Sequence, residues 1–275
     1  VLQKTGMPIK STPELKPWKE FLARMKNATE SVRIGLVGKY VELPDAYKSI
    51  NEALFQAATY NDHKLDLKLI HSEKINKDNV EEMLGSMDGI IIAPGFGQRG
   101  IEGKFIALKY AREHDVPTFG ICLGMQCMVI EFARDVLGYA DANSTEMEVS
   151  TNHNVIDLME SQKSISNMGG TMRLGEYDCI LQEGSKAAKA YNSTHIKERH
   201  RHRFEFNSDY RDEFEKAGMK CVGENPDTHL VEVVEIPNLK WFVGVQYHPE
   251  YNSTVLKPNP LFVDFVKAAI ENKKK

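Results

Sequence analysis

Short strand-like runs alternate with helical patterns over residues 32–138, and this alternation limits the possible folds more than any other feature of the sequence. Each run is too short for a helix, and each is followed by a longer segment of helical periodicity. Strands joined through helices form right-handed crossovers and a parallel sheet, so we expect an α/β fold. The predicted strands are 32–38, 65–70, 89–93 and 117–121, and the predicted helices are 45–58, 78–84, 104–114 and 124–137.

The alternation is lost between residues 140 and 210, where Gly169-Gly170 and Gly175 predict turns. We expect an inserted antiparallel section there. After it, the pattern predicts two further strands and a final helix, at 230–236, 241–247 and 260–270. The whole therefore predicts a single α/β domain with a central, mostly parallel sheet flanked by helices.

The first 30 residues differ from the rest of the chain. They are polar, contain Pro8, Pro13 and Pro17, and include a short amphipathic stretch at 18–25. This composition is typical of a linker. We therefore predict a linker over residues 1–30 and one domain over 31–275, and because the sequence does not begin with Met we expect a fragment.

The overall composition is that of a soluble globular protein, with 41% hydrophobic and 27% charged residues. The net charge of −4 gives no reason to expect nucleic acid or a membrane as a partner, and no apolar run approaches the ~18 residues of a membrane span. The four cysteines form no Cys-x-x-Cys pair, so the sequence predicts no metal site. Reduced thiols in a cytoplasmic protein are the expectation.

A nucleophile motif lies between the fourth predicted strand and the following helix. Gly120-Ile121-Cys122-Leu123-Gly124 has the form of the G-x-S-x-G elbow, with sulfur in place of oxygen. The turn would lift Cys122 above the sheet edge, the Leu123 N–H would face a developing oxyanion, and the helix N-terminus would favour a thiolate. A buried structural cysteine beside a strand–helix turn is the alternative.

A base and its orienting group lie at the end of the last predicted strand. His248 and Glu250 are two residues apart in an extended segment, so their side chains point the same way. The carboxylate can then hold the imidazole tautomer and stabilise the imidazolium, as in a catalytic triad. An isolated surface histidine is the alternative, and the combination of elbow cysteine and neighbouring carboxylate favours the triad.

Residues 94–100 form a glycine-rich segment after the third predicted strand. The spacing of Gly95, Gly97 and Gly100 matches the G-x-G-x-x-G dinucleotide fingerprint, but the fingerprint belongs to a first strand and needs an acidic residue ~20 positions later. We favour the Gly95 N–H as a second oxyanion donor within a mobile loop. A merely permissive turn remains an alternative.

Arginine and histidine alternate over residues 199–203 ahead of Phe204-Glu205-Phe206. Three arginines make cation binding unfavourable, whereas an anion such as a substrate carboxylate or a nucleotide phosphate fits guanidinium groups. A solvated basic face is the alternative.

These motifs resemble the class I (triad-type) glutamine amidotransferases. Residues 120–126 and 246–250 look like the general signature of that class. Within it, the glutaminase domains of CTP synthases are the most similar, and the resemblance extends over roughly residues 30–255. The stretches that carry this second assignment are 38–49, 141–146, 169–175 and 199–204.

The resemblance implies that Cys122 attacks the side-chain amide of glutamine, with His248 moving the proton and Glu250 behind it. Gly95 and Leu123 would supply oxyanion N–H groups. Glutamine would be held by Arg203 at its carboxylate, by Glu146 at its amino group and by Gln126, beside the adjoining positions Gly124 and Met125. One departure is Pro94, which stands where the family has glycine.

The resemblance also implies partners outside this chain. Family members pass the ammonia to a preceding amidoligase domain, which uses ATP and Mg²⁺ to convert UTP to CTP in pyrimidine nucleotide biosynthesis, a ligase reaction. GTP activates the coupling, and the full-length enzymes are homo-oligomers. No cofactor is implied for the glutaminase domain itself, and residues 1–30 would be the linker from the missing amidoligase domain.

Two readings from other classes remain. A papain-like cysteine protease would have a similar Cys–His spacing, but its C-G-[SA]-C-[WY] context is absent. A non-catalytic module that binds GTP or a partner domain is the other, and the intact Cys122, His248 and Glu250 argue against it.

Overall fold

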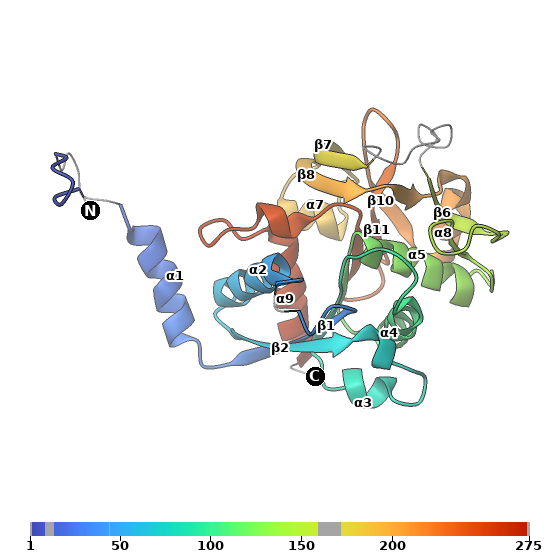
Figure 1. The fold of residues 1–275 in the computed structure, drawn as a ribbon, viewed down its shortest axis with the longest axis horizontal. Coiled ribbons are helices and arrows are strands. Elements are labelled where there is room, and N and C mark those ends of the chain that lie inside the picture. Colours follow the sequence, from blue (N-terminus) through green and yellow to red (C-terminus); the bar gives the residue numbers. More distant parts are fainter. Residues whose placement is uncertain (1, 9–13, 44, 159–171, 274–275) are drawn as a thin grey trace.

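The computed structural model describes residues 2–8, 14–43, 45–158 and 172–273. A nine-stranded sheet crosses the molecule (Figure 1), and its first five strands are parallel, whereas the remaining four continue it in antiparallel fashion. In sheet order the strands are β2 (Lys64–His71), β1 (Ser31–Gly38), β3 (Gly89–Ile92), β4 (Thr118–Ile121), β12 (Phe242–Val245), β11 (Val231–Glu235), β10 (Lys220–Glu224), β7 (Arg173–Leu181) and β8 (His195–His202).

Helices pack on both faces of the parallel half of the sheet, which is why its strands β3, β4 and β12 are buried throughout. One face is covered by α2 (Lys48–Tyr60) and α9 (Pro260–Lys273), and the other by α4 (Ile101–Glu113) and α5 (Leu123–Asp135). Shorter helices are α3 (Val80–Leu84), α7 (Lys186–Tyr191) and α8 (Arg211–Ala217), with 3₁₀ turns η1 (Ser72–Lys74), η2 (Ser208–Tyr210) and η3 (Pro249–Asn252).

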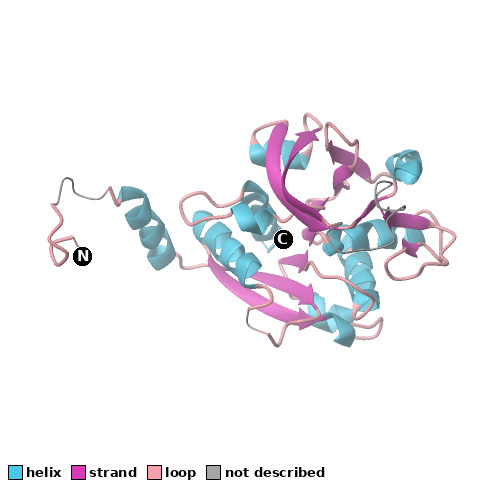
Figure 2. Cartoon of the chain, turned by 45° about the horizontal axis from the view of Figure 1, so that its top comes forward, coloured by secondary structure: helices cyan, strands magenta, loops and turns pink. Residues whose placement is uncertain are grey.

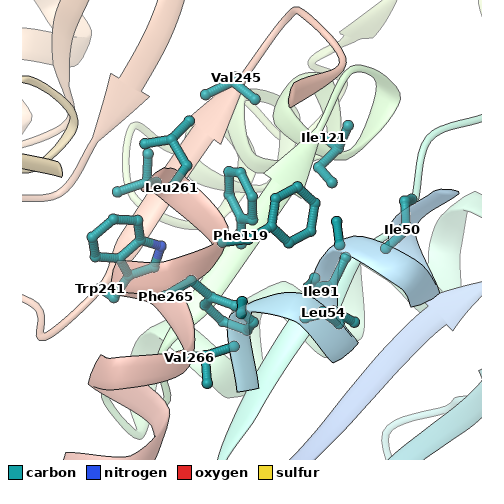
Figure 3. Packing of buried hydrophobic residues seen from close by; sticks show 14 of the residues in the cluster. Ile50, Leu54, Ile91, Phe119, Ile121, Trp241, Val245, Leu261, Phe265 and Val266 are labelled. Carbon is teal, nitrogen blue, oxygen red and sulfur yellow. The ribbon is translucent and has the colours of Figure 1, made fainter. Parts of the chain in front are cut away.

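Phe119 of β4 lies at the centre of the core that α2 and α9 form on one face of the sheet (Figure 3). Its ring meets Phe262 and Phe265 of α9 at centroid distances of 5.3 and 5.9 Å. Ile50 and Leu54 of α2 belong to the same core, so two helices that are distant in sequence cover one face of this strand. This packing fixes the strand that leads into Cys122.

A second sheet of three strands lies beside the main one, formed by β5 (Asn143–Ser144), β6 (Asn154–Leu158) and β9 (Phe204–Phe206). The predicted parallel sheet and the antiparallel section are therefore both confirmed. The antiparallel strands β7 and β8, however, extend the main sheet instead of standing apart from it.

Two local predictions differ from the structure, and a third cannot be compared with it. The helix expected from Asp45 begins at Lys48, because the Tyr47 hydroxyl accepts hydrogen bonds from the backbone N–H groups of Lys39 and Tyr40 and holds the preceding residues as a loop. The turn predicted at Gly175 is wrong, since this residue pairs with His200 inside β7. The turn at 169–170 lies outside the described residues.

Helix α1 (Lys16–Asn27) contains the predicted amphipathic stretch and stands apart from the rest of the molecule (Figures 1 and 2). It has no buried residue. Its contacts include an edge-to-face pair of Phe21 with Phe55 and a 2.7 Å hydrogen bond from Arg24 to the carbonyl of Tyr60. None of the described helices is both long and apolar enough to span a bilayer.

Candidate active site

Cys122 forms the predicted elbow between β4 and α5. Its backbone has φ +53° and ψ −107°, a positive-φ conformation that costs energy for any residue with a side chain. The Cys122 N–H donates to the carbonyl of Val245 at 2.7 Å, which ties the elbow to the neighbouring strand β12. This hydrogen bond to the neighbouring strand helps to stabilise the strained backbone of Cys122.

The two glycines of the motif allow close packing. A Cβ at Gly124 would lie 2.2 Å from the Ile92 carbonyl oxygen, and one at Gly120 would lie 2.8 Å from the backbone of Gly124. Neither position tolerates a side chain, because the start of α5 presses directly against β3. The G-x-C-x-G spacing therefore reflects helix–strand contact on either side of the nucleophile.

His248 and Glu250 follow β12, which lies parallel to β4 with Val245 opposite Ile121. Because the carboxyl ends of parallel neighbours meet at one edge, His248 is brought next to Cys122. Nδ1 of His248 lies 2.7 Å from Oε1 of Glu250, and the ring stacks on Tyr251 at 5.0 Å between centroids. The His248 N–H donates to the carbonyl of Arg199 at 2.8 Å.

The electrostatics of the site favour the imidazolium form of His248. Burial alone lowers the pKa of His248, but the negative charge of a Cys122 thiolate, a hydrogen bond to it and the Glu250 carboxylate outweigh burial and raise the pKa to about 11. For the other three thiols, burial is the largest influence on the pKa. Burial raises the pKa of Cys127 and of Cys221 to about 12, and that of Cys179 further still.

A cleft of about 600 Å³ opens in front of Cys122 and His248. The structure brings six of the predicted site residues to its wall: Gly95, Cys122, Gln126, Glu146, Arg203 and His248. Glu250 lies behind His248. The remaining three predicted residues do not line the cleft. They are Leu123, Gly124 and Met125, which are buried in the first turn of α5.

Gln126 makes more contacts with the protein than the sequence indicated. Its Nε2 donates to the Phe204 carbonyl at 2.9 Å and to Oε1 of Gln246 at 3.1 Å. Gln246 in turn directs its Nε2 at the Cys122 sulfur, 3.6 Å away. Sequence reasoning did not assign Gln246 a role, although it precedes His248 in the motif by two residues.

Glu146 faces the loop that carries Gly95. Its Oε1 accepts a 2.9 Å hydrogen bond from the backbone N–H of Gly97. Pro94 and Gly95 both line the cleft, so the departure at Pro94 does not remove Gly95 from the cleft wall.

The basic run lies in strand β8 except for Arg203, which follows it, and the residues of the strand alternate between outside and inside. Arg199 and Arg201 are exposed, whereas His200 and His202 are buried. Arg201 and Arg203 line the cleft and Arg199 does not. The anion-binding interpretation therefore fits only two of the three arginines. Arg199 and Arg201 share the exposed face of the strand, so the position along the strand, and not the face, decides which side chain reaches the cleft.

The inward-facing side chains form a buried polar cluster that the sequence did not reveal. Nδ1 of His200 lies 2.8 Å from Nε2 of His202, and Arg173 donates to Glu232 at 2.6 Å. Glu205 completes the cluster, and burial raises its pKa to about 8. Among the described residues, no group of three or more His, Cys, Asp or Glu side chains has a geometry that could hold a metal ion.

An α/β sheet that presents a strained elbow cysteine to a histidine with a carboxylate behind it defines a triad-type cysteine enzyme. Residues 42–268 match the family described as glutamine amidotransferase class-I. The chain belongs to that family.

Individual relatives narrow the comparison. The chain is 66% identical over 271 residues to the CTP synthase of Bacteroides fragilis and 64% identical over 275 residues to that of Porphyromonas gingivalis. The matches cover 98% and 100% of this chain but 51% of each relative, so the chain spans about half the length of the curated relatives it matches.

A solved structure extends the comparison to three dimensions. The glutaminase domain of Trypanosoma brucei CTPS with bound acivicin is 37% identical, with a TM-score of 0.83, over 88% of this chain and 94% of that one. The likeness therefore covers nearly all of one glutaminase domain.

Proposed function

We propose that this chain is the glutaminase part of a CTP synthase and that it hydrolyses L-glutamine to glutamate and ammonia through a thioester on Cys122. The observation that carries the proposal is the convergence of Cys122, His248 and Glu250 at the carboxyl ends of two adjacent parallel strands. The likeness to a glutaminase domain supports the same substrate.

In the first half of the proposed reaction, the Cys122 thiolate attacks the side-chain amide carbon of glutamine. The carbonyl oxygen becomes an oxyanion, which the N–H groups of Gly95 and Leu123 stabilise. As the C–N bond breaks, the His248 imidazolium gives its proton to the leaving nitrogen. The products are ammonia and a γ-glutamyl thioester.

In the second half, the neutral His248 accepts a proton from water, and the resulting hydroxide attacks the thioester carbon. The C–S bond breaks, glutamate leaves, and the thiolate–imidazolium pair is restored. Glu250 stays ionised throughout and holds the ring through Nδ1.

For substrate binding we propose that Arg203 contacts the α-carboxylate and Glu146 the amino group, since both side chains line the cleft with opposite charge. The Nε2 of Gln126 already donates to Phe204 and Gln246, so its Oε1 is the atom left for substrate. Backbone groups of Leu123, Gly124 and Met125 complete this proposed site beneath the substrate.

At the level of the whole protein, we propose that the ammonia passes to an amidoligase domain that uses ATP and Mg²⁺ to convert UTP to CTP, with GTP as activator, in a homo-oligomer. The support is the likeness to CTP synthases, of which this chain matches about half. Four free, buried cysteines support a cytoplasmic location.

A direct assay tests the proposal. Purified chain is incubated with L-glutamine, and glutamate and ammonia are quantified with and without GTP, using Cys122→Ala as the control. Equimolar glutamate and ammonia from the unaltered chain, absent in the control, is the expected result. Cleavage of a casein substrate without glutamine hydrolysis would instead favour a protease, and GTP binding with neither activity a regulatory module.

A further inference from the structure

Two buried lysines lie beside the loop that carries Gly95, and nothing in the proposed reaction uses them. Lys39 follows β1 and Lys104 lies in α4, and both side chains are almost fully buried. A buried amine is costly unless it has a strong hydrogen-bond partner, so their partners show what they do.

Lys104 holds the backbone on one side of Gly95. Its Nζ donates to the carbonyl of Ala93 at 2.6 Å. Ala93 still donates its N–H to Val37, but the chain then leaves the sheet at Pro94, which has no N–H. The Ala93 carbonyl therefore lies where the hydrogen bonds between the strands end, and the Lys104 amine of α4 is its donor.

Lys39 holds the backbone on the other side. Its Nζ donates to the carbonyl of Phe96 and lies over the rings of Tyr40 and Phe96, 5.2 and 5.0 Å from their centroids. The stem of Lys39 packs beside Gly95, since a Cβ built there would be 3.7 Å from Cε of Lys39. Glu146 adds a third contact through the N–H of Gly97.

We propose that Lys104 and Lys39 are positioning residues that fix the Gly95 peptide as an oxyanion donor by holding the carbonyls of Ala93 and Phe96. The inference rests on the proposed glutaminase function. Neither amine lines the cleft, so each acts through the backbone and not on the substrate. A peptide held on both sides loses little entropy or alignment when the oxyanion forms.

The main test compares Lys104→Met with Lys109→Met. Methionine keeps an apolar stem and removes the donor, while Lys109 lies on the same helix but is exposed and paired with Asp135. We expect Lys104→Met to lower kcat for glutamine hydrolysis by about 10- to 100-fold, below the full loss of an oxyanion donor, with KM changed less than about threefold. Lys109→Met should match the unaltered chain.

Alkylation of Cys122 by iodoacetamide separates positioning of the loop from an effect on the nucleophile, because that reaction forms no oxyanion. Its rate should stay within about threefold in Lys104→Met. A fall in alkylation parallel to the fall in kcat would overturn the proposal, as would a kcat equal to that of Lys109→Met.

Hydrogen–deuterium exchange of the peptide covering residues 93–98 gives a readout that needs no activity. We expect faster exchange in Lys104→Met than in the unaltered chain or in Lys109→Met, and unchanged exchange would overturn the proposal. An unaltered chain that hydrolyses no glutamine would refute the proposed function, whereas the exchange result would still decide whether the lysines fix the loop. Lys39→Met provides the same tests if Lys104→Met does not fold.

Discussion

Cys122 differs from the other three cysteines in both backbone and environment. It alone lies at the elbow and faces a histidine, whereas burial raises the pKa of Cys127 to about 12. We predict that Cys122→Ala abolishes glutamine hydrolysis and that Cys127→Ala keeps at least about half of the activity. Peptide mapping after iodoacetamide treatment should find the label on Cys122. Even labelling of all four thiols would contradict the assignment.

His248 and Glu250 should be separable by mutation. In the proposed reaction His248 transfers the proton in both half-reactions, so His248→Ala should remove nearly all turnover. Glu250→Gln keeps a hydrogen-bonding group beside Nδ1 but loses the charge that stabilises the imidazolium, so it should lose about 10²- to 10⁴-fold and retain more than His248→Ala. The measurement is steady-state ammonia release. Full activity in Glu250→Gln would leave a Cys–His dyad as the better description.

The arginines of β8 and the residue after it make a graded series. Arg203→Ala should raise KM for glutamine by about 10- to 100-fold, because a charge-assisted bond contributes ~1.5–3 kcal/mol. Arg201→Ala should have a smaller effect, and Arg199→Ala, whose side chain lies outside the cleft, almost none. Equal effects at the three positions would mean a diffuse positive field instead of a specific contact.

At the scale of elements, the sequence predicts one half of the sheet well and the other half poorly. Strands β1, β3 and β4 are short and apolar because helices bury both of their faces, and such runs are easily recognised. Strand β8 has the alternation of a strand, but three of its four inward residues are polar, so polarity hides the pattern. They are Glu198, His200 and His202. The sequence also does not reveal the contacts of Lys104 and Gln246, because their hydrogen bonds join separate segments of the chain.

The cluster behind β8 should make stability depend on pH. Burial and the Glu232 charge raise the pKa of Glu205 from 4.5 to about 8, against the opposing effect of Arg173. Because the folded state holds this proton more tightly, the stabilisation is complete below pH ~4.5 and is lost as pH rises through about 8. We predict that Glu205→Gln removes this contribution, so that the melting temperature of the unaltered chain falls relative to that of the variant between pH 5 and 8.5.

The control for that experiment is Glu176→Gln on the exposed side of β7, which should follow the unaltered chain at every pH. Parallel pH curves for the unaltered chain and Glu205→Gln would show that Glu205 is ionised in the folded state and that the predicted linkage is absent. Glu205 directly follows Arg203 and Phe204, and both of these residues line the cleft. Activity should therefore be followed in the same buffers.

At the scale of the whole molecule, helix α1 of the predicted linker stands apart from the domain (Figure 1), and its role as a linker stays a prediction. Helix α1 buries no residue and contacts α2 through Phe21 and Arg24. We predict that deletion of residues 1–27 shifts the melting temperature by less than about 3 °C, which corresponds to less than about 1 kcal/mol in a domain of this size. A larger shift in calorimetry would place α1 within the domain and move its boundary.

The backbone of Cys122 has a consequence for how such a molecule can change. Its positive-φ conformation costs about 1–3 kcal/mol, which glycine at the same place would not incur. The residue that we propose as the nucleophile is therefore one that weakens the fold. Selection for thermal robustness alone would favour its loss, so the cysteine persists only where the reaction itself is under selection, and any stabilising redesign of this chain must exclude position 122 from its choices.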